Sequence, residues 1–180
     1  VTLSKDVAVN SPIEITKGNV TLDLNGKTIT AANGDAIVVS NNAELTITGN
    51  GIVKVEKGAN GCAVWAHHGG KVTIENGTFS TNDDVDGDRC DCIYAGSTAD
   101  MSAGTITING GTFKYDGENE EGHKFLLNKK DNTASAIIVY GGVFHKFNPA
   151  ISYGEPNAPV NFVAEGYESI QEGDNYIVKK

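Results

Sequence analysis

The feature that most constrains the fold of this chain is a turn signal, an Asn-Gly or Gly-Gly step, that occurs five times before a short apolar segment. Counted from the first residue of each step, the intervals are 25, 26, 33 and 32 residues. Self-similarity at a period of roughly 20 to 50 residues is the signature of a stacked repeat. The five steps are Asn25-Gly26, Asn50-Gly51, Asn76-Gly77, Asn109-Gly110 and Gly141-Gly142.

Each repeat contains three short segments with the character of β-strands. One precedes each of the first four turns, a second follows every turn, and a third lies further along. Alternating β-branched and aromatic residues, bounded by Gly or Asn, favour strands, and no segment shows the sustained i, i+3, i+4 pattern of a helix. The third strands are predicted at residues 36–40, 62–66, 91–95 and 136–140.

Stacking these repeats places equivalent residues about 4.8 Å apart on neighbouring strands. The inward positions then form three apolar columns, as a narrow shared core requires. An antiparallel sandwich also accommodates short strands, but it does not by itself predict three columns in phase. We therefore prefer a coil of stacked β-strands, in which each repeat forms one turn. The columns are Leu24, Ile47, Ile74 and Ile108; Ile29, Val53, Phe79, Phe113 and Phe144; and Val38, Val64, Ile93 and Ile138.

Over roughly residues 15 to 147 the chain resembles the right-handed parallel β-helix (pectate-lyase-like) superfamily. The segment Leu22–Ile29 and the Asn-Gly-Thr-Phe and Gly-Gly-Thr-Phe steps look like repeats in cell-surface proteins of gut bacteria and in virion proteins of their phages. The segments 161–167 and 176–178 are similar to the terminus of such domains. The resemblance implies an all-β, right-handed parallel β-helix (a solenoid) of about five rungs. Because the superfamily includes lyases, hydrolases, adhesins and inert spikes, it does not fix an activity.

We predict a β-helix over residues 1–147 and a C-terminal cap over residues 148–180. A solenoid must cover its last apolar rung, and here prolines interrupt the repeat before two short strands around Gln171–Asp174. We interpret these strands as a capping hairpin. Loop insertions at about 81–91 and 115–133 are expected to project from the coil, where functional residues tend to lie.

The charge balance excludes two classes of partner. Fourteen basic and 23 acidic residues give a net charge of −9, and Arg89 is the only arginine. Neither nucleic acid nor an anionic membrane surface is expected, because both need a basic face. No apolar stretch approaches the roughly 20 residues that span a bilayer. Because the chain starts at Val1, we interpret it as a mature or excised fragment.

Metal ligation has one weak candidate, the acidic segment with Asp84, Asp86 and Asp88 around Gly87. Alternating carboxylates bind Ca²⁺, but the EF-hand pattern fails because Ile93 stands where a bidentate Glu is needed. A solvated acidic loop is our preferred interpretation, so no cofactor is predicted, with Ca²⁺ as the alternative.

Adjacent histidines such as His67 and His68 are poor metal partners without a third ligand. Cys62, Cys90 and Cys92 are interpreted as small buried hydrophobes whose redox state the sequence leaves open.

The candidate catalytic residues are the outward carboxylates Asp23 and Glu75. They lie in the same column of the predicted coil and are separated by two rungs. That spacing is roughly 9 to 10 Å, at or past the upper limit for an inverting pair of carboxylates. We therefore predict a non-enzymatic protein, with a polysaccharide lyase or glycoside hydrolase as the alternative. Asp23 and Glu75 are the residues to test for that alternative.

The most suggestive feature is an apolar stripe on the outer face of the third strands. It has Val39, Trp65, Tyr94 and Val139 in one column, followed by His67. Such a stripe marks either an interface or internal cover, or a platform on which aromatic rings stack against sugars. We predict a structural and binding module of a phage virion (a fibre, spike or decoration protein) or of a bacterial cell surface. It is expected to be extracellular or part of the virion, to form homo-oligomers or bind other virion or surface proteins, and to adhere to glycans.

Overall fold

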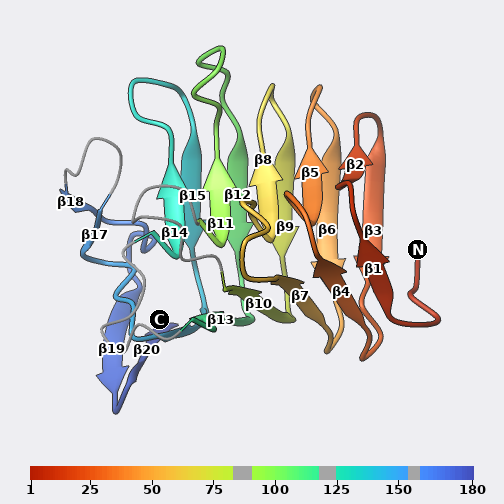
Figure 1. Cartoon of the computed structure of the whole chain (residues 1–180). Coiled ribbons are helices and arrows are strands. Elements are labelled where there is room, and N and C mark those ends of the chain that lie inside the picture. The colour runs from red at the N-terminus through yellow and green to blue at the C-terminus, as the bar shows by residue number, and fades with distance from the viewer. Residues whose placement is uncertain (83–90, 118–124, 154–158) are drawn as a thin grey trace.

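The computed structural model describes residues 1–82, 91–117, 125–153 and 159–180. These residues form β-strands without a helix, and most of the strands pair in parallel (Figure 1). In this part of the chain, no helix has the length and apolar content needed to cross a membrane. The sheets and their pairing make the fold all-β, with a β-helix-like arrangement of parallel sheets.

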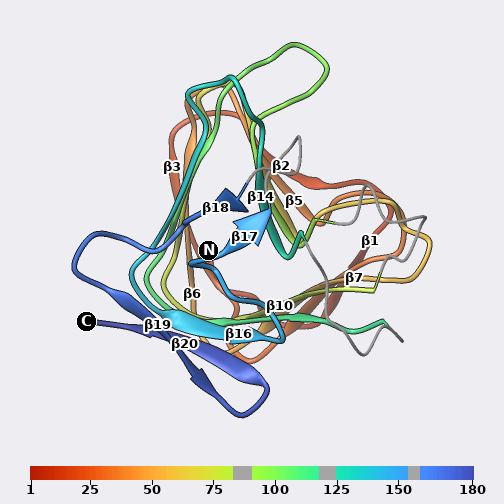
Figure 2. The ribbon, with the colours of Figure 1, turned by 90° about the vertical axis from the view of Figure 1, so that its left-hand side faces the viewer.

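Three sheets form the coil, and the chain visits them in a fixed order (Figure 2). Sheet 1 contains β1 (Val7–Val9), β4 (Thr28–Ala31), β7 (Ile52–Val55), β10 (Thr78–Thr81), β13 (Thr112–Tyr115) and β16 (Gly142–His145). Sheet 2 contains β2 (Ile13–Ile15), β5 (Ile37–Val39), β8 (Val64–Ala66), β11 (Ile93–Ala95) and β14 (Leu127–Lys129). Sheet 3 contains β3 (Asn19–Asp23), β6 (Glu44–Thr48), β9 (Lys71–Ile74), β12 (Thr105–Ile108) and β15 (Ala136–Val139).

The inward column of sheet 1 is confirmed residue by residue. Ile29, Val53, Phe79, Phe113 and Phe144 are direct partners on successive parallel strands, and all are fully buried. The Phe79 and Phe113 rings lie 5.3 Å apart at an interplanar angle of 12°, and the Phe113 and Phe144 rings lie 4.9 Å apart at 11°. Phenylalanine rings at equivalent positions of three successive turns thus stack with offset faces, which is a favourable aromatic geometry.

The predicted column of sheet 3 is shifted at its first member. Leu22, and not Leu24, is the partner of Ile47, which is followed by Ile74 and Ile108. Leu24 lies beyond the end of β3 and is also fully buried. The apolar residues at 22 and 24 both suit a core position, so alternation alone did not separate them.

The predicted column of sheet 2 is wrong at both ends. Ile37, and not Val38, is the partner of Val64, because the register is displaced by one residue. Ile138 lies in β15, next to Thr107 of sheet 3, and Leu127 of β14 takes the position after Ile93. The expected loop 115–133 therefore contains a strand of the coil. Segment 136–140 directly precedes a Gly-Gly turn, which is the position of the first strand in every earlier repeat.

Both backbone conformation and close packing explain why Asn and Gly occupy these turns. Asn25 and Gly26 both have positive φ, at 47° and 70°, a region that Gly and Asn tolerate best. The Asn76 side-chain amide donates a hydrogen bond of 2.7 Å to the Asn50 side-chain oxygen of the previous turn. A Cβ at Gly51 would lie 2.3 Å from Cβ of Leu24. Successive turns therefore approach too closely at this corner for a larger residue.

The two ends of the coil differ. At the N-terminal end, apolar residues of β1 and β2 are only partly buried. At the C-terminal end, β19 (Glu168–Glu172) and β20 (Asn175–Lys179) form an antiparallel hairpin, and β20 pairs with β16. The strands β17 (Ser152–Tyr153) and β18 (Pro159–Val160) form a small antiparallel pair nearby (Figure 1). Phe162 and Val178 from this region join the core cluster.

Replacing the middle ring of the phenylalanine stack is expected to destabilise the whole coil. Phe113→Ala leaves a cavity between Phe79 and Phe144, at a cost of about 3–5 kcal/mol in the free energy of unfolding. The control is Thr107→Ala on an outward position of β12, where a cross-strand contact is worth less than about 1 kcal/mol. Urea unfolding followed by circular dichroism measures both variants. Equal losses for the two would contradict the central role of the stack.

Candidate ligand-binding face

The outward column of sheet 2 contains the aromatic pair that the sequence singled out. Trp65 and Tyr94 are direct partners on β8 and β11, as predicted. The flanking members differ from the prediction, because the register is displaced by one residue in β5 and β15 belongs to sheet 3. Val39 points into the core and is fully buried, and Val139 is buried in sheet 3. The column runs Glu14, Val38, Trp65, Tyr94 and Asn128.

Within this column, the exposed aromatic surface comes from Trp65 and from His67 two residues later. Trp65 and His67 are partly exposed, whereas Tyr94 is 8% exposed and Val38 is 7% exposed. The Trp65 indole N–H donates a hydrogen bond of 2.6 Å to the carbonyl of Gly96, which fixes the ring. The His67 ring stacks on the Trp65 ring at a centroid distance of 4.3 Å. The pair is a two-ring platform on a sheet face.

A chain of hydrogen bonds continues from His67 to an acidic residue in another turn. Nδ1 of His67 hydrogen-bonds to Nδ1 of His68, and Nε2 of His68 pairs with the Asp100 carboxylate. The Ser102 backbone N–H donates to Asp100 Oδ1 at 3.1 Å, and the Ser102 hydroxyl accepts from the His68 backbone N–H at 3.3 Å. Four side chains from two neighbouring turns thus form one connected group.

The local sequence explains why the two histidines occupy this corner. His68 and Gly69 both have positive φ, at 47° and 76°. A Cβ at Gly69 would lie 2.2 Å from the Asn42 side-chain oxygen of the previous turn, so glycine is required there. The backbone therefore turns sharply after His67, and the two imidazoles meet at their Nδ1 atoms. The sequence predicts a role for His67 but none for Asp100. Asp100 lies in the loop after β11, and the repeat spacing does not predict which residues of a loop contact a neighbouring turn.

The electrostatics of the group are set by hydrogen bonding and burial. Hydrogen bonds from the Ser102 hydroxyl and backbone N–H, with smaller contributions from Ser97 and His68, lower the pKa of Asp100 to about 2. Partial burial lowers the pKa of His67, and so does the nearby His68, while Asp100 and Glu14 act in the opposite direction. At neutral pH, Asp100 is therefore an ionised hydrogen-bond acceptor beside a neutral His67.

The carboxylates proposed for catalysis lie on a different face. Asp23 is the partner of Thr48 at the end of β6, and Glu75 follows β9, so both lie in one outward column with Thr48 between them. Each has a nearby hydrogen-bond donor: the Asn25 backbone N–H reaches Asp23 Oδ1 at 2.9 Å, and the Asn109 side-chain amide reaches Glu75 Oε1 at 2.9 Å. These bonds give each carboxylate a structural partner.

The described residues contain no group of three or more His, Cys, Asp or Glu side chains placed to hold a metal ion. The predicted calcium ligands Asp84, Asp86 and Asp88 lie outside the described residues, as does Cys90. The calcium interpretation therefore stays a prediction.

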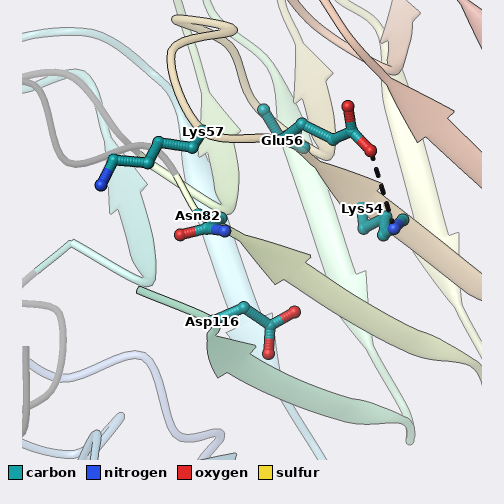
Figure 3. A pocket seen from close by; sticks show the side chains of 6 residues that line it. Lys54, Glu56, Lys57, Asn82 and Asp116 are labelled. Carbon is teal, nitrogen blue, oxygen red and sulfur yellow. Dashed lines mark ion pairs between the residues drawn. The ribbon is translucent and has the colours of Figure 1, made fainter. Parts of the chain in front are cut away.

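A polar hollow of about 330 Å³ lies where the chain leaves β7, β10 and β13 (Figure 3). Its ionic groups are of both signs: Lys54 and Glu56 form an ion pair at 3.8 Å, and Asp116 pairs with Lys114 at 2.8 Å. Lys57 extends away from the Lys54–Glu56 pair (Figure 3). The residues that line the hollow include no aromatic side chain, so it lacks the stacking surface that Trp65 and His67 provide.

A buried polar contact lies at the corner before sheet 2. The Cys62 backbone N–H donates to Asp35 Oδ1 at 2.7 Å. Burial raises the pKa of the Asp35 carboxyl, and it raises the pKa values of the Cys62 and Cys92 thiols well above their ordinary range. Neither thiol is in a disulfide. Burial keeps both protonated, which matches their interpretation as small hydrophobes.

Comparison with known proteins gives no match: no family model, no curated protein and no solved structure matches this chain.

The raised pKa of Asp35 predicts a pH-dependent gain in stability for Asp35→Asn. A carboxyl whose pKa is raised on folding stabilises the protein below the unfolded pKa of about 3.9, and this contribution is lost as the pH rises through the folded pKa. The variant keeps an oxygen for the Cys62 N–H but has no charge to bury. Its melting temperature should exceed that of the wild type at neutral pH, and the difference should vanish near pH 3. A variant less stable than the wild type at neutral pH would contradict this.

Proposed function

We propose that this protein is a non-enzymatic structural and binding module, a right-handed parallel β-helix of about five rungs that adheres to glycans. In this proposal residues 148–180 form the C-terminal cap, and Trp65 and His67 form the glycan-binding face. The observation that carries the proposal is the stack of the His67 ring on the Trp65 ring at 4.3 Å on an outward sheet face.

The chemistry of this face suits a sugar. Flat aromatic surfaces bind the apolar C–H faces of sugar rings, while nearby polar groups bind their hydroxyls. The Asp100 carboxylate and the imidazoles supply such groups beside Trp65. The Trp65 ring is held by its hydrogen bond to Gly96 and by the strand ladder, so little conformational entropy is lost when a ligand binds.

The setting of the module follows from the resemblance of its repeats. We propose a virion protein of a phage, such as a fibre, spike or decoration protein, or a protein of a bacterial cell surface. A stacked coil is a rigid rod whose turns are each held by their neighbours, which suits a displayed protein. Homo-oligomers, or contacts with other virion or surface proteins, are part of the proposal. The apolar residues of β1 and β2, at the N-terminal end of the coil, are only partly buried and are candidates for such contacts.

The glycan proposal is tested by one substitution. Trp65→Ala removes the larger ring of the platform and should abolish the signal on a glycan array, a loss of about tenfold or more in affinity. Tyr140→Ala is the matched control, because Tyr140 is also an exposed aromatic, at 40% exposure, but lies at the end of sheet 3. Equal signals from the wild type and Trp65→Ala would contradict the proposal.

The absence of enzymatic activity is tested separately. Purified protein incubated with acidic and neutral polysaccharides should release neither reducing ends nor unsaturated sugars. If either product appears and is lost in both Asp23→Asn and Glu75→Gln, the chain is a carbohydrate-active enzyme. Product that persists in both variants would place the activity elsewhere, and it would equally contradict a non-enzymatic role.

A further inference from the structure

The hydrogen-bond chain from Asp100 to His67 fixes the positions of the protons on the two imidazoles while both rings are neutral. Asp100, with its pKa of about 2, is ionised at neutral pH and can only accept a hydrogen bond. Nε2 of His68 therefore carries the proton shared with Asp100. While both imidazoles are neutral, Nδ1 of His68 has no proton, so it accepts the hydrogen bond from Nδ1 of His67.

In this arrangement Nε2 of His67 has a free lone pair. With its proton on Nδ1, the neutral His67 ring presents Nε2 as an acceptor. If the pair of rings takes up one further proton and keeps its internal hydrogen bonds, that proton resides on Nε2 of His67. Uptake of one proton by the pair thus converts His67 Nε2 from a hydrogen-bond acceptor into a donor, and the positive charge is shared across the Nδ1–Nδ1 hydrogen bond.

We propose that this nitrogen determines which class of glycan the Trp65 face binds: neutral sugars at neutral pH, and acidic sugars only after His67 is protonated. The inference rests on the proposed glycan-binding function and adds the substrate class. In the neutral state, His67 Nε2 accepts a hydrogen bond from a sugar hydroxyl, which can donate. A sugar carboxylate cannot donate and meets a lone pair instead.

The charged groups around His67 also favour neutral sugars over acidic ones at neutral pH. Asp100 on the loop after β11 and Glu14 on β2 are the acidic groups that act on His67, and His68 is its imidazole neighbour. With both histidines neutral, the face carries negative charge, in a chain whose net charge is −9. A uronic acid is repelled in this state. Protonation of the histidine pair adds a positive charge beside Trp65 and supplies a donor for the carboxylate.

The switch is expected below the ordinary pKa of histidine, about 6.5. Burial and His68 lower the pKa of His67, which keeps the acceptor state dominant at neutral pH. The two rings of the platform remain stacked in both states, because the proton is added at the edge of the imidazole. Binding of a neutral sugar is therefore expected to depend on pH much less than binding of an acidic one.

The first measurement tests the proton positions without any ligand. Long-range ¹H–¹⁵N correlation spectra of the full chain, at about pH 7.5, should show His67 protonated at Nδ1 and His68 protonated at Nε2. Asp100→Ala should abolish this preference, because the anchor of the chain is gone. The opposite tautomers in the wild type would overturn the inference and leave the glycan proposal standing.

The second measurement compares two forms of one ligand. The probes are the neutral glycan with the strongest array signal and the same glycan oxidised at C6 to a uronic acid. At about pH 7.5 the neutral form should bind about tenfold more tightly, and near pH 5 the oxidised form should gain at least that factor. A preference for the acidic form at neutral pH, or a ratio that does not change with pH, would overturn the inference.

The matched control is His67→Phe, which keeps a ring to stack on Trp65 but has no nitrogen. The neutral glycan should still bind, with a several-fold loss, and the ratio between the two forms should lose most of its dependence on pH. An unaltered pH dependence in this variant would place the switch elsewhere. If no glycan binds the wild type at any pH, the proposed function and this inference both fail, whatever the tautomers are.

Discussion

The structure depends on the lateral hydrogen bonding of parallel strands in exact register between successive turns of the coil. Register places like residues above one another, so a position that is apolar in one turn must be apolar in the next. The phenylalanine stack of sheet 1 is the clearest case, because Phe113 contacts the rings of Phe79 and Phe144, which occupy the same position in the turns before and after it. Burial in this narrow interior is shared between turns, and each turn depends on its neighbours.

Register also organises the outer surface. Side chains that point away from the core stack in the same columns, which brings Trp65 next to Tyr94 although they lie in different turns. The polar group beside them depends on two corners: His67 and His68 follow β8, and Asp100 follows β11. The strands supply a fixed ring, and the corners supply the ionisable groups around it. Gly69 permits this because a side chain there would overlap Asn42 of the previous turn.

The sequence was sufficient to predict the strands nearest the Asn-Gly turns. Ile29, Val53, Phe79, Phe113 and Phe144 lie at nearly constant offsets from these turns, so spacing alone set their register. The register of sheet 2 is harder to predict from the sequence, because the segment between each Asn-Gly turn and the following strand of sheet 2 varies in length. From Asn25 to Ile37 the separation is 12 residues, from Asn50 to Val64 it is 14, and from Asn76 to Ile93 it is 17. The spacing therefore predicts Val38 at the position that Ile37 occupies, and it predicts a loop where the structure has β14. Asp100 was missed for the same reason, since a contact between two corner loops leaves no periodic trace.

If Trp65 lies in the proposed ligand-binding face, the fluorescence of its indole ring must respond to a bound glycan. Trp65 is the only tryptophan in the chain, so all indole emission reports on that one position. Titration with a bound glycan should shift the emission and protect it from quenching by acrylamide, with one saturation curve for both effects. Binding of the glycan by calorimetry without any change in emission or quenching would show that the site lies elsewhere and would contradict the account.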